Sequence, residues 1–246
     1  MTQLYDALGS TYRDHRRPDE RIAAAVARAL GDAHTVVNVG AGTGAYEPHD
    51  RAVVAIEPSI TMIRQRPRGS APVVQASALQ LPFVDGAFEA ALAVLTVHHW
   101  PDRSRGLTEL ARVVRDRVVI VTWDPSTSGF WLTEGYFPEL VDIDRQILPT
   151  MEELRRILGA IAIYPLPIPY DCSDGFLGAY WRRPHAYLDA GIRRAISTFS
   201  KLTDTQAGLA RLRRDIEDGT WHRRYGHLLR RRELDVGYRI VVARGV

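Results

Sequence analysis

Short apolar runs rich in β-branched residues recur through the first half of the chain, at residues 36–40, 52–56, 73–76, 88–95 and 117–123. Polar and apolar positions do not alternate within these runs, which is typical of strands buried on both faces. Segments with helical spacing separate most of the runs. This alternation of strands and helices predicts a parallel sheet that is covered by helices on both sides.

The helical segments carry their own start and stop signals. After Pro18, residues Ile22, Val26 and Leu30 share one helical face, and Gly31 is a typical residue to end the helix. A second helix is predicted ahead of the fifth apolar run, with its apolar positions at Leu107, Leu110 and Val114. A third is predicted from residue 150, where Thr150 and Glu153 have the spacing of a capping box.

The second half of the chain departs from this alternation. Aromatic residues gather in 130–137 and prolines in 163–175, so both segments are predicted to be largely irregular, apart from one core strand near 161–165. Residues 180–232 have the pattern of arginine-rich helices, and residues 236–246 again that of a strand. The predicted fold is α/β: a Rossmann-like, mostly parallel seven-stranded sheet with an N-terminal cap and a helical insertion before the last strand.

Residues 36–44 are VVNVGAGTG, so the first predicted strand leads directly into Gly40, Gly42 and Gly44. Glycine lets backbone N–H groups approach a ligand where a Cβ would intrude. The spacing is GxGxG, not the GxGxxG of dinucleotide-binding folds. Glu57, at the end of the second predicted strand, has a carboxylate suited to accept both hydroxyls of a ribose. NAD and S-adenosylmethionine both remain open as ligands on these residues alone.

The downstream segments ASALQLPFVDGAFEAALAVLTVHHW and RVVIVTWDP resemble the class I S-adenosylmethionine-dependent methyltransferases, in the small-molecule branch that includes the quinone-biosynthesis methyltransferases. The resemblance spans Tyr5 to about Asp124 and rests on four motifs in order. It implies S-adenosylmethionine as the cofactor, and methyl transfer to a small-molecule acceptor by in-line displacement at the sulfonium methyl. The expected organisation is N-terminal cap helices over 1–31, an S-adenosylmethionine-binding core over 32–125, substrate-pocket segments and the helical insertion over 126–235, and the final core strand over 236–246.

The resemblance also implies a set of cofactor-binding positions, drawn from the N-terminal segment, the glycine loop and the ends of the next three strands. They are Tyr12, Arg16, Gly40, Ala41, Gly42, Gly44, Glu57, Pro58, Met62, Ala76, Ser77, Ala78 and Leu95. Ser77 stands where the family usually has an acidic residue near the adenine. The stretch AYEPHDR is shorter than in the family, so we expect the helix between the first two strands to be vestigial. Glu57→Ala is expected to weaken cofactor binding with little loss of stability, because we expect this strand tip to face solvent.

His98 and His99, at the end of the fourth predicted strand, are the candidate catalytic residues, because imidazole is a natural base near neutral pH. The alternative is that the pair only shapes the turn. For the acceptor, a cluster of large aromatic side chains either lines the pocket or packs the insertion against the sheet, namely Phe130, Trp131, Tyr136, Phe137 and Trp181.

The charge balance and the cysteine count bear on which macromolecules and metals the protein could bind. Thirty-two basic and 29 acidic residues leave a net charge of only +3, which is weak support for a nucleic-acid partner. Cys172 is the only cysteine, so no disulfide within the chain and no cysteine-based zinc site is expected, and we predict no metal. We expect a cytoplasmic monomer or homodimer that binds neither membrane nor nucleic acid. Two alternatives stay open: an RNA- or protein-modifying methyltransferase, favoured by WHRRYGHLLRRR, and a catalytically silent S-adenosylmethionine-binding module.

Overall fold

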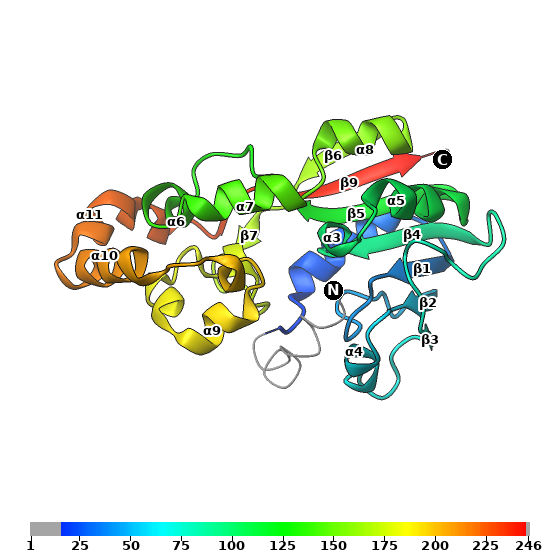
Figure 1. The fold of residues 1–246 in the computed structure, drawn as a ribbon, viewed down its shortest axis with the longest axis horizontal. Coiled ribbons are helices and arrows are strands. Elements are labelled where there is room, and N and C mark those ends of the chain that lie inside the picture. The colour runs from blue at the N-terminus through cyan, green and yellow to red at the C-terminus, as the bar shows by residue number, and fades with distance from the viewer. Residues whose placement is uncertain (1–15, 245–246) are drawn as a thin grey trace.

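A computed structural model describes residues 16–244 and contains a seven-stranded sheet with the strand order β3-β2-β1-β4-β5-β9-β6 (Figure 1). The strands are β1 (Thr35–Val39), β2 (Ala52–Ile56), β3 (Val73–Val74), β4 (Phe88–Val94), β5 (Val114–Trp123), β6 (Ile161–Pro165) and β9 (Tyr238–Arg244). The first five run parallel, whereas β9 pairs antiparallel with both β5 and β6. The predicted fold class is confirmed.

Helices cover both faces of this sheet. Along β5, alternate side chains pack into the apolar clusters on the two opposite faces. Val119 and Val121 belong to the apolar cluster that contains the buried side of α3 (Glu20–Leu30). Val118 and Ile120 belong to the cluster on the other face, with α5 (Arg103–Arg112) and α8 (Met151–Leu158). Residues 118–123 of the strand are therefore buried on both faces, as the sequence pattern indicated.

The predicted helix signals act locally as expected. Gly31 ends α3 with φ +58°, and its N–H donates to the Arg28 carbonyl oxygen. The Thr150 side chain accepts the Glu153 N–H at 3.0 Å, but the Glu153 carboxylate pairs with Arg103 of α5 and does not return to Thr150. Only one of the two capping-box hydrogen bonds forms, because the Glu153 carboxylate links α8 to α5 instead.

The remaining elements lie in the connection from β2 to β3, in the turn after β4, and in the insertion between β5 and β9. The α-helices are α4 (Ile60–Arg64), α6 (Trp131–Gly135), α7 (Glu139–Ile147), α9 (Ala190–Ala195), α10 (Gln206–Glu217) and α11 (Thr220–Tyr225). The short 3-10 helices are η1 (Val97–His99), η2 (Leu177–Tyr180), η3 (Pro184–Leu188), η4 (Phe199–Lys201) and η5 (Gly226–Arg230). Strands β7 (Ile168–Pro169) and β8 (Glu233–Leu234) form a separate two-stranded ladder.

The insertion packs on the end of the sheet and shares its core, as Figure 1 shows on the side away from β1–β3. Trp131 is fully buried at its centre, with ring centroids 5.4 Å from Trp221 and 5.6 Å from Tyr187. Two expectations were wrong in detail. Residues 131–135 form α6 in a segment predicted as irregular, because this aromatic packing stabilises a short helix, and Val114 begins β5 instead of belonging to the helix before it.

Candidate active site

The glycine loop leaves the carboxyl end of β1 and turns sharply beside β2. Gly40 has φ +72°, and a Cβ there would lie 2.0 Å from Thr96 Oγ1, so this position tolerates only glycine. The N–H groups of Gly40 and Ala41 both donate to the Ile56 carbonyl oxygen, at 2.8 and 3.0 Å. The loop is thereby fixed at the sheet edge where ligands of α/β folds bind.

Glu57 follows β2 directly and holds the loop from the other side. Its Oε2 accepts the Gly42 N–H and its Oε1 accepts the Ser59 N–H, both at 2.8 Å. Burial raises the pKa of this carboxyl, and the two backbone donors act against the rise. Glu57 is only 7% exposed, so the expectation of a solvent-facing strand tip was wrong. Each carboxylate oxygen still has a lone pair for a further donor, which suits a pair of neighbouring hydroxyls.

The connection from β1 to β2 contains no helix in the structure, as the short AYEPHDR stretch predicted. A buried ion pair supports it instead. The Arg66 guanidinium binds both Glu47 oxygens, at 2.9 and 2.7 Å, and also the Gly42 and Ala71 carbonyl oxygens. Asn38 donates to Glu47 Oε1 at 3.1 Å. The glycine loop is therefore tied to the segment after α4 by charges in the interior.

A cavity of about 390 Å³ opens over this loop, within the range of small-molecule sites. Among the predicted residues, those that line it are Arg16, Gly40, Ala41, Gly42, Glu57, Pro58, Met62, Ser77, Ala78, Leu95 and His99. Gly44, Ala76 and His98 do not line it, and Tyr12 lies outside the described residues. Gly44 instead faces Glu47 and Arg66, and Ala76 packs on the apolar cluster beneath.

Sequence reasoning missed several lining residues, namely Asn38, Thr43, Ala45, Tyr46, Ser59, Val94, Thr96, Trp100 and Pro101. Tyr46 is the most informative of them. It has φ +65°, it is buried, and its hydroxyl donates to Asp174 Oδ2 at 2.7 Å. Burial, followed by the Asp174 charge, raises the pKa of Tyr46, so the phenol stays a hydrogen-bond donor.

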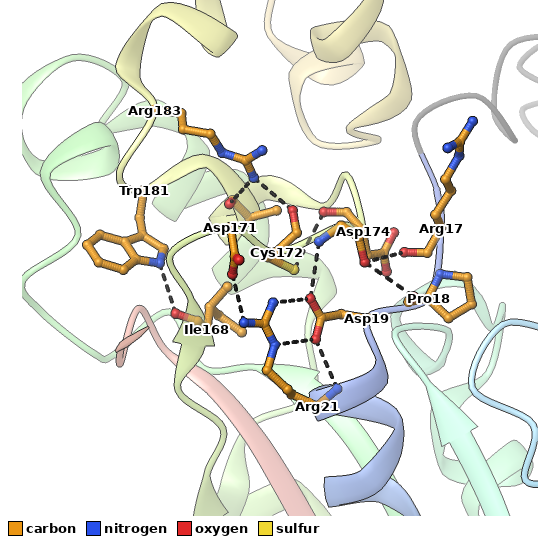
Figure 2. Close-up of polar contacts among 12 residues, drawn as sticks. Arg17, Pro18, Asp19, Arg21, Ile168, Asp171, Cys172, Asp174, Trp181 and Arg183 are labelled. Carbon is orange, nitrogen blue, oxygen red and sulfur yellow. Dashed lines mark hydrogen bonds and ion pairs between the residues drawn. The ribbon is translucent and has the colours of Figure 1, made fainter. Parts of the chain in front are cut away.

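Asp174, in the insertion, binds side chains from two other parts of the chain, the segment before α3 and the loop after β1. Its other oxygen, Oδ1, accepts Arg16 Nε at 2.6 Å, so Arg16 and Tyr46 share one buried carboxylate. Close by, Asp19 caps α3 by accepting the Arg21 N–H, as Figure 2 shows, and its side chain also accepts the Ser173 N–H. The start of α3 is thus fastened to the segment of the insertion that carries Asp174.

A second cavity of about 70 Å³ lies between the end of β4 and the insertion. Arg16, Leu95 and His99 line both cavities and so mark their junction. Leu95 has φ +50°, a strained value for a branched side chain, and its N–H donates to the Val121 carbonyl oxygen. Strain of this kind is often held at functional sites.

The histidine and carboxylate side chains at this second cavity are those of His98, His99 and Asp144. Burial lowers the pKa of His99 to about 4, helped by the charges of Lys201 and Arg16. Burial, then the neighbouring His99, hold the pKa of His98 well below its usual range. Burial raises the pKa of Asp144 to about 6, against the hydrogen bond from Thr198 Oγ1 at 3.1 Å. Both imidazoles are therefore neutral near pH 7.

The aromatic residues suggested from the sequence as a pocket lining are core residues in the structure. Phe130, Trp131, Tyr136, Phe137 and Trp181 are all at most 2% exposed, and none lines either cavity. The aromatic side chains at the second cavity are Trp123, Phe176 and Tyr238. Of the two alternatives left open, packing of the insertion is the one that the structure supports.

The residues present fit S-adenosylmethionine. A glycine at positive φ, a buried carboxylate with spare acceptor capacity and an apolar wall around Met62 and Pro58 match a backbone-close, ribose-bearing ligand. Within residues 16–244, no group of three or more His, Cys, Asp or Glu side chains is placed to hold a metal ion. No helix in that range is long and apolar enough to cross a membrane.

Comparison with known proteins points the same way. Residues 37–122 match a family described as "Methyltransferase domain". Demethylmenaquinone methyltransferases from Corynebacterium kroppenstedtii and Mycolicibacterium vanbaalenii are each 33% identical, over 32% and 43% of this chain. These matches cover only 37% and 44% of those two relatives.

Solved structures extend the similarity to the whole chain. A putative methyltransferase from an antibiotic biosynthesis pathway of Anabaena variabilis is 30% identical, with a TM-score of 0.80, over 93% of this chain and 98% of that one. A Thermotoga maritima S-adenosylmethionine-dependent methyltransferase, a possible histamine N-methyltransferase, shares the fold at 15% identity, with a TM-score of 0.60 and full coverage of both chains.

The chain belongs to the class I S-adenosylmethionine-dependent methyltransferases, an enzyme family whose cofactor is S-adenosylmethionine. The family and cofactor predicted from the glycine loop, Glu57 and the downstream motifs are confirmed.

Proposed function

We propose that this protein transfers the methyl group of S-adenosylmethionine to a small-molecule acceptor, as the similarity to quinone-biosynthesis enzymes also suggests. The observation that carries the proposal is the junction of the two cavities at Arg16, Leu95 and His99. The larger cavity takes the cofactor and the smaller one the reacting end of the acceptor, so the two reactants meet at this junction.

Each part of the larger cavity has a separate task. Glu57 binds the ribose hydroxyls, Gly40 and Gly42 let the backbone approach the ligand, and Met62 and Pro58 border the adenine. Arg16, oriented by Asp174 through Nε and Nη2, lies at the wall of this cavity, and its positive charge suits the methionine carboxylate. When bound, the cofactor supplies an electrophilic methyl group on its sulfonium. The protein then has mainly to align the acceptor with it, and positioning of this kind lowers barriers by up to ~7–11 kcal/mol.

His99 is the group that we assign to the acceptor's proton. It lines both cavities, and its low pKa keeps the imidazole neutral and able to accept. His98 lines only the smaller cavity, with its ring centroid 3.9 Å from that of His99, and we assign it to holding the His99 ring.

The segment WHRRYGHLLRRR, which favoured a macromolecular acceptor on sequence grounds, gives that alternative little support. In α11 and the residues after it, Trp221 and Leu228 are buried while Arg223, Arg224 and Arg230 are exposed, which is the pattern of a packed helix with a solvated face. A silent cofactor-binding module differs from our proposal only in turnover. The cytoplasmic location, the monomeric or homodimeric state and the domain boundaries stay predictions from the sequence.

Calorimetry with S-adenosylhomocysteine and NAD, followed by methyl-transfer assays with labelled S-adenosylmethionine on a panel of hydroxylated and amine metabolites, tests the proposal. We expect S-adenosylhomocysteine to bind, NAD not to bind, and one class of panel compound to be methylated. Binding of NAD alone would overturn the cofactor assignment, and cofactor binding with no turnover on any acceptor would favour the silent module.

The pH dependence of kcat/KM is expected to show no histidine titration near the usual value. His99 must be neutral to accept a proton, and its pKa is about 4, so activity should stay level through neutral pH and fall only as the pH falls through about 4. The measurement is kcat/KM against pH for the first acceptor that the panel identifies. If kcat/KM instead falls as the pH falls through about 6, and Asp144→Asn abolishes this fall, then Asp144 and not His99 accepts the acceptor's proton.

A further inference from the structure

A third hollow, of about 600 Å³, lies on the face of the sheet that carries α3 and is separate from both cavities of the active site. It runs between α3 and the sheet edge formed by β6 and residues 165–170. Its floor is Ile240 and Val242 of β9. We call it the α3 groove.

The walls of the α3 groove are apolar and partly open. Ile22 and Ala25 of α3 line one side, and Tyr164 of β6 lines the other. Tyr164 pairs with Ile240 in the ladder, so both side chains lie on the same face, and Tyr164 is 52% exposed. An exposed aromatic ring above an apolar floor offers contact area to an apolar ligand.

The charges around the α3 groove are mostly positive. Arg28, Arg232 and Arg244 line it, are exposed, and make no side-chain hydrogen bond or ion pair with any residue from 16 to 244. Glu233 is the acidic residue of the lining. Arg21 also lines the groove, but it forms ion pairs with Asp19 and Asp171, which Figure 2 shows as dashed lines.

We propose that the α3 groove binds a single-chain amphiphile from solution, with a carboxylate or phosphate head held by the three open arginines and its apolar chain along the β9 floor. The positive rim complements an anion and arginine suits both head groups. A second copy of this chain is disfavoured, because an isologous contact would bring two arginine-rich rims together. A membrane surface is disfavoured because the site is concave.

The test is calorimetry of the full chain with decyl phosphate and with decyltrimethylammonium, both below their critical micelle concentrations. We expect saturable binding of the phosphate and none of the cationic probe. Arg28→Glu with Arg232→Glu should weaken decyl phosphate binding by about tenfold or more, equivalent to about 1.4 kcal/mol. The matched control is Arg155→Glu with Arg156→Glu, an exposed pair on α8, across the sheet, which should leave the affinity unchanged.

Three outcomes would overturn the proposal. They are no saturable binding of decyl phosphate, equal binding of both probes, and equal weakening by the control pair. Sedimentation with phosphatidylglycerol vesicles, lost in the Arg28 and Arg232 variant, would assign the groove to a membrane surface, and light scattering that shows an arginine-dependent dimer would assign it to a second copy. S-adenosylhomocysteine affinity should not change in either variant, so this test stands apart from that of the proposed function.

Discussion

Replacing Glu57 by alanine is expected to weaken S-adenosylhomocysteine binding by about two to four orders of magnitude. In the proposed site, Glu57 makes two charge-assisted hydrogen bonds to the ribose, each worth ~1.5–3 kcal/mol, and ~1.4 kcal/mol corresponds to a tenfold change in affinity. The structure adds a second expected effect. The N–H groups of Gly42 and Ser59 lose their acceptor, and an unsatisfied buried donor costs ~1–3 kcal/mol, so the free energy of unfolding should fall as well.

Glu57→Gln should also be costly, because both carboxylate oxygens accept a backbone N–H and the amide would turn its NH₂ toward one of them. Calorimetry measures the affinity and chemical unfolding the stability. The matched control is Glu89→Ala. That carboxylate also accepts two backbone N–H groups, from His34 and Thr35, but at the opposite end of β1, so it should lower stability without changing affinity. Unchanged affinity in folded Glu57→Ala would mean that the residue only caps the loop.

Glu47→Ala is expected to destabilise the fold by ~3–5 kcal/mol, because it leaves a buried guanidinium without its counter-charge. The Arg66 and Glu47 side chains are only 5% and 3% exposed. Asn38 would lose its acceptor in the same variant. Urea unfolding measures the loss, and the glycine loop should lose its support at the same time.

Two variants make the Glu47 result interpretable. Glu47→Leu combined with Arg66→Met should recover much of the stability, since apolar residues replace buried ion pairs at little cost. Asp142→Ala removes the partner of Arg145 in an exposed pair at 3.5 Å and should cost less than ~1 kcal/mol. A Glu47→Ala loss as small as that of Asp142→Ala would contradict a supporting role for the buried pair.

Local signals account for what could be predicted from the sequence. The strands, the caps at Gly31 and Thr150, and the glycine loop with Glu57 each depend on residues close together in the chain. Long-range contacts were not predictable in this way. Arg16 and Asp174 are 158 positions apart, and neither neighbourhood contains a pattern that indicates the other.

The aromatic residues illustrate a second limit. Trp131 and Trp123 are both large, buried and close in sequence, yet Trp131 is at the centre of the insertion and Trp123 lines the smaller cavity. The difference arises because Trp123 ends β5 at the ligand-binding edge of the sheet, whereas Trp131 follows a turn into the insertion. Composition indicates that such side chains are buried, but topology decides which of them meet a ligand.

The place of β9 in the sheet also bears on how the chain is synthesised. β9 lies between β5 and β6, and it is the one sheet neighbour of β6 among the described strands. While the ribosome makes residues 166–237, β5 therefore has an open edge and β6 has no partner in the sheet. Open strand edges invite pairing with other chains. A nascent chain that stalls before residue 238 exposes the apolar edge of β5, so the translation rate of the insertion sets how long the unfinished protein is prone to aggregate.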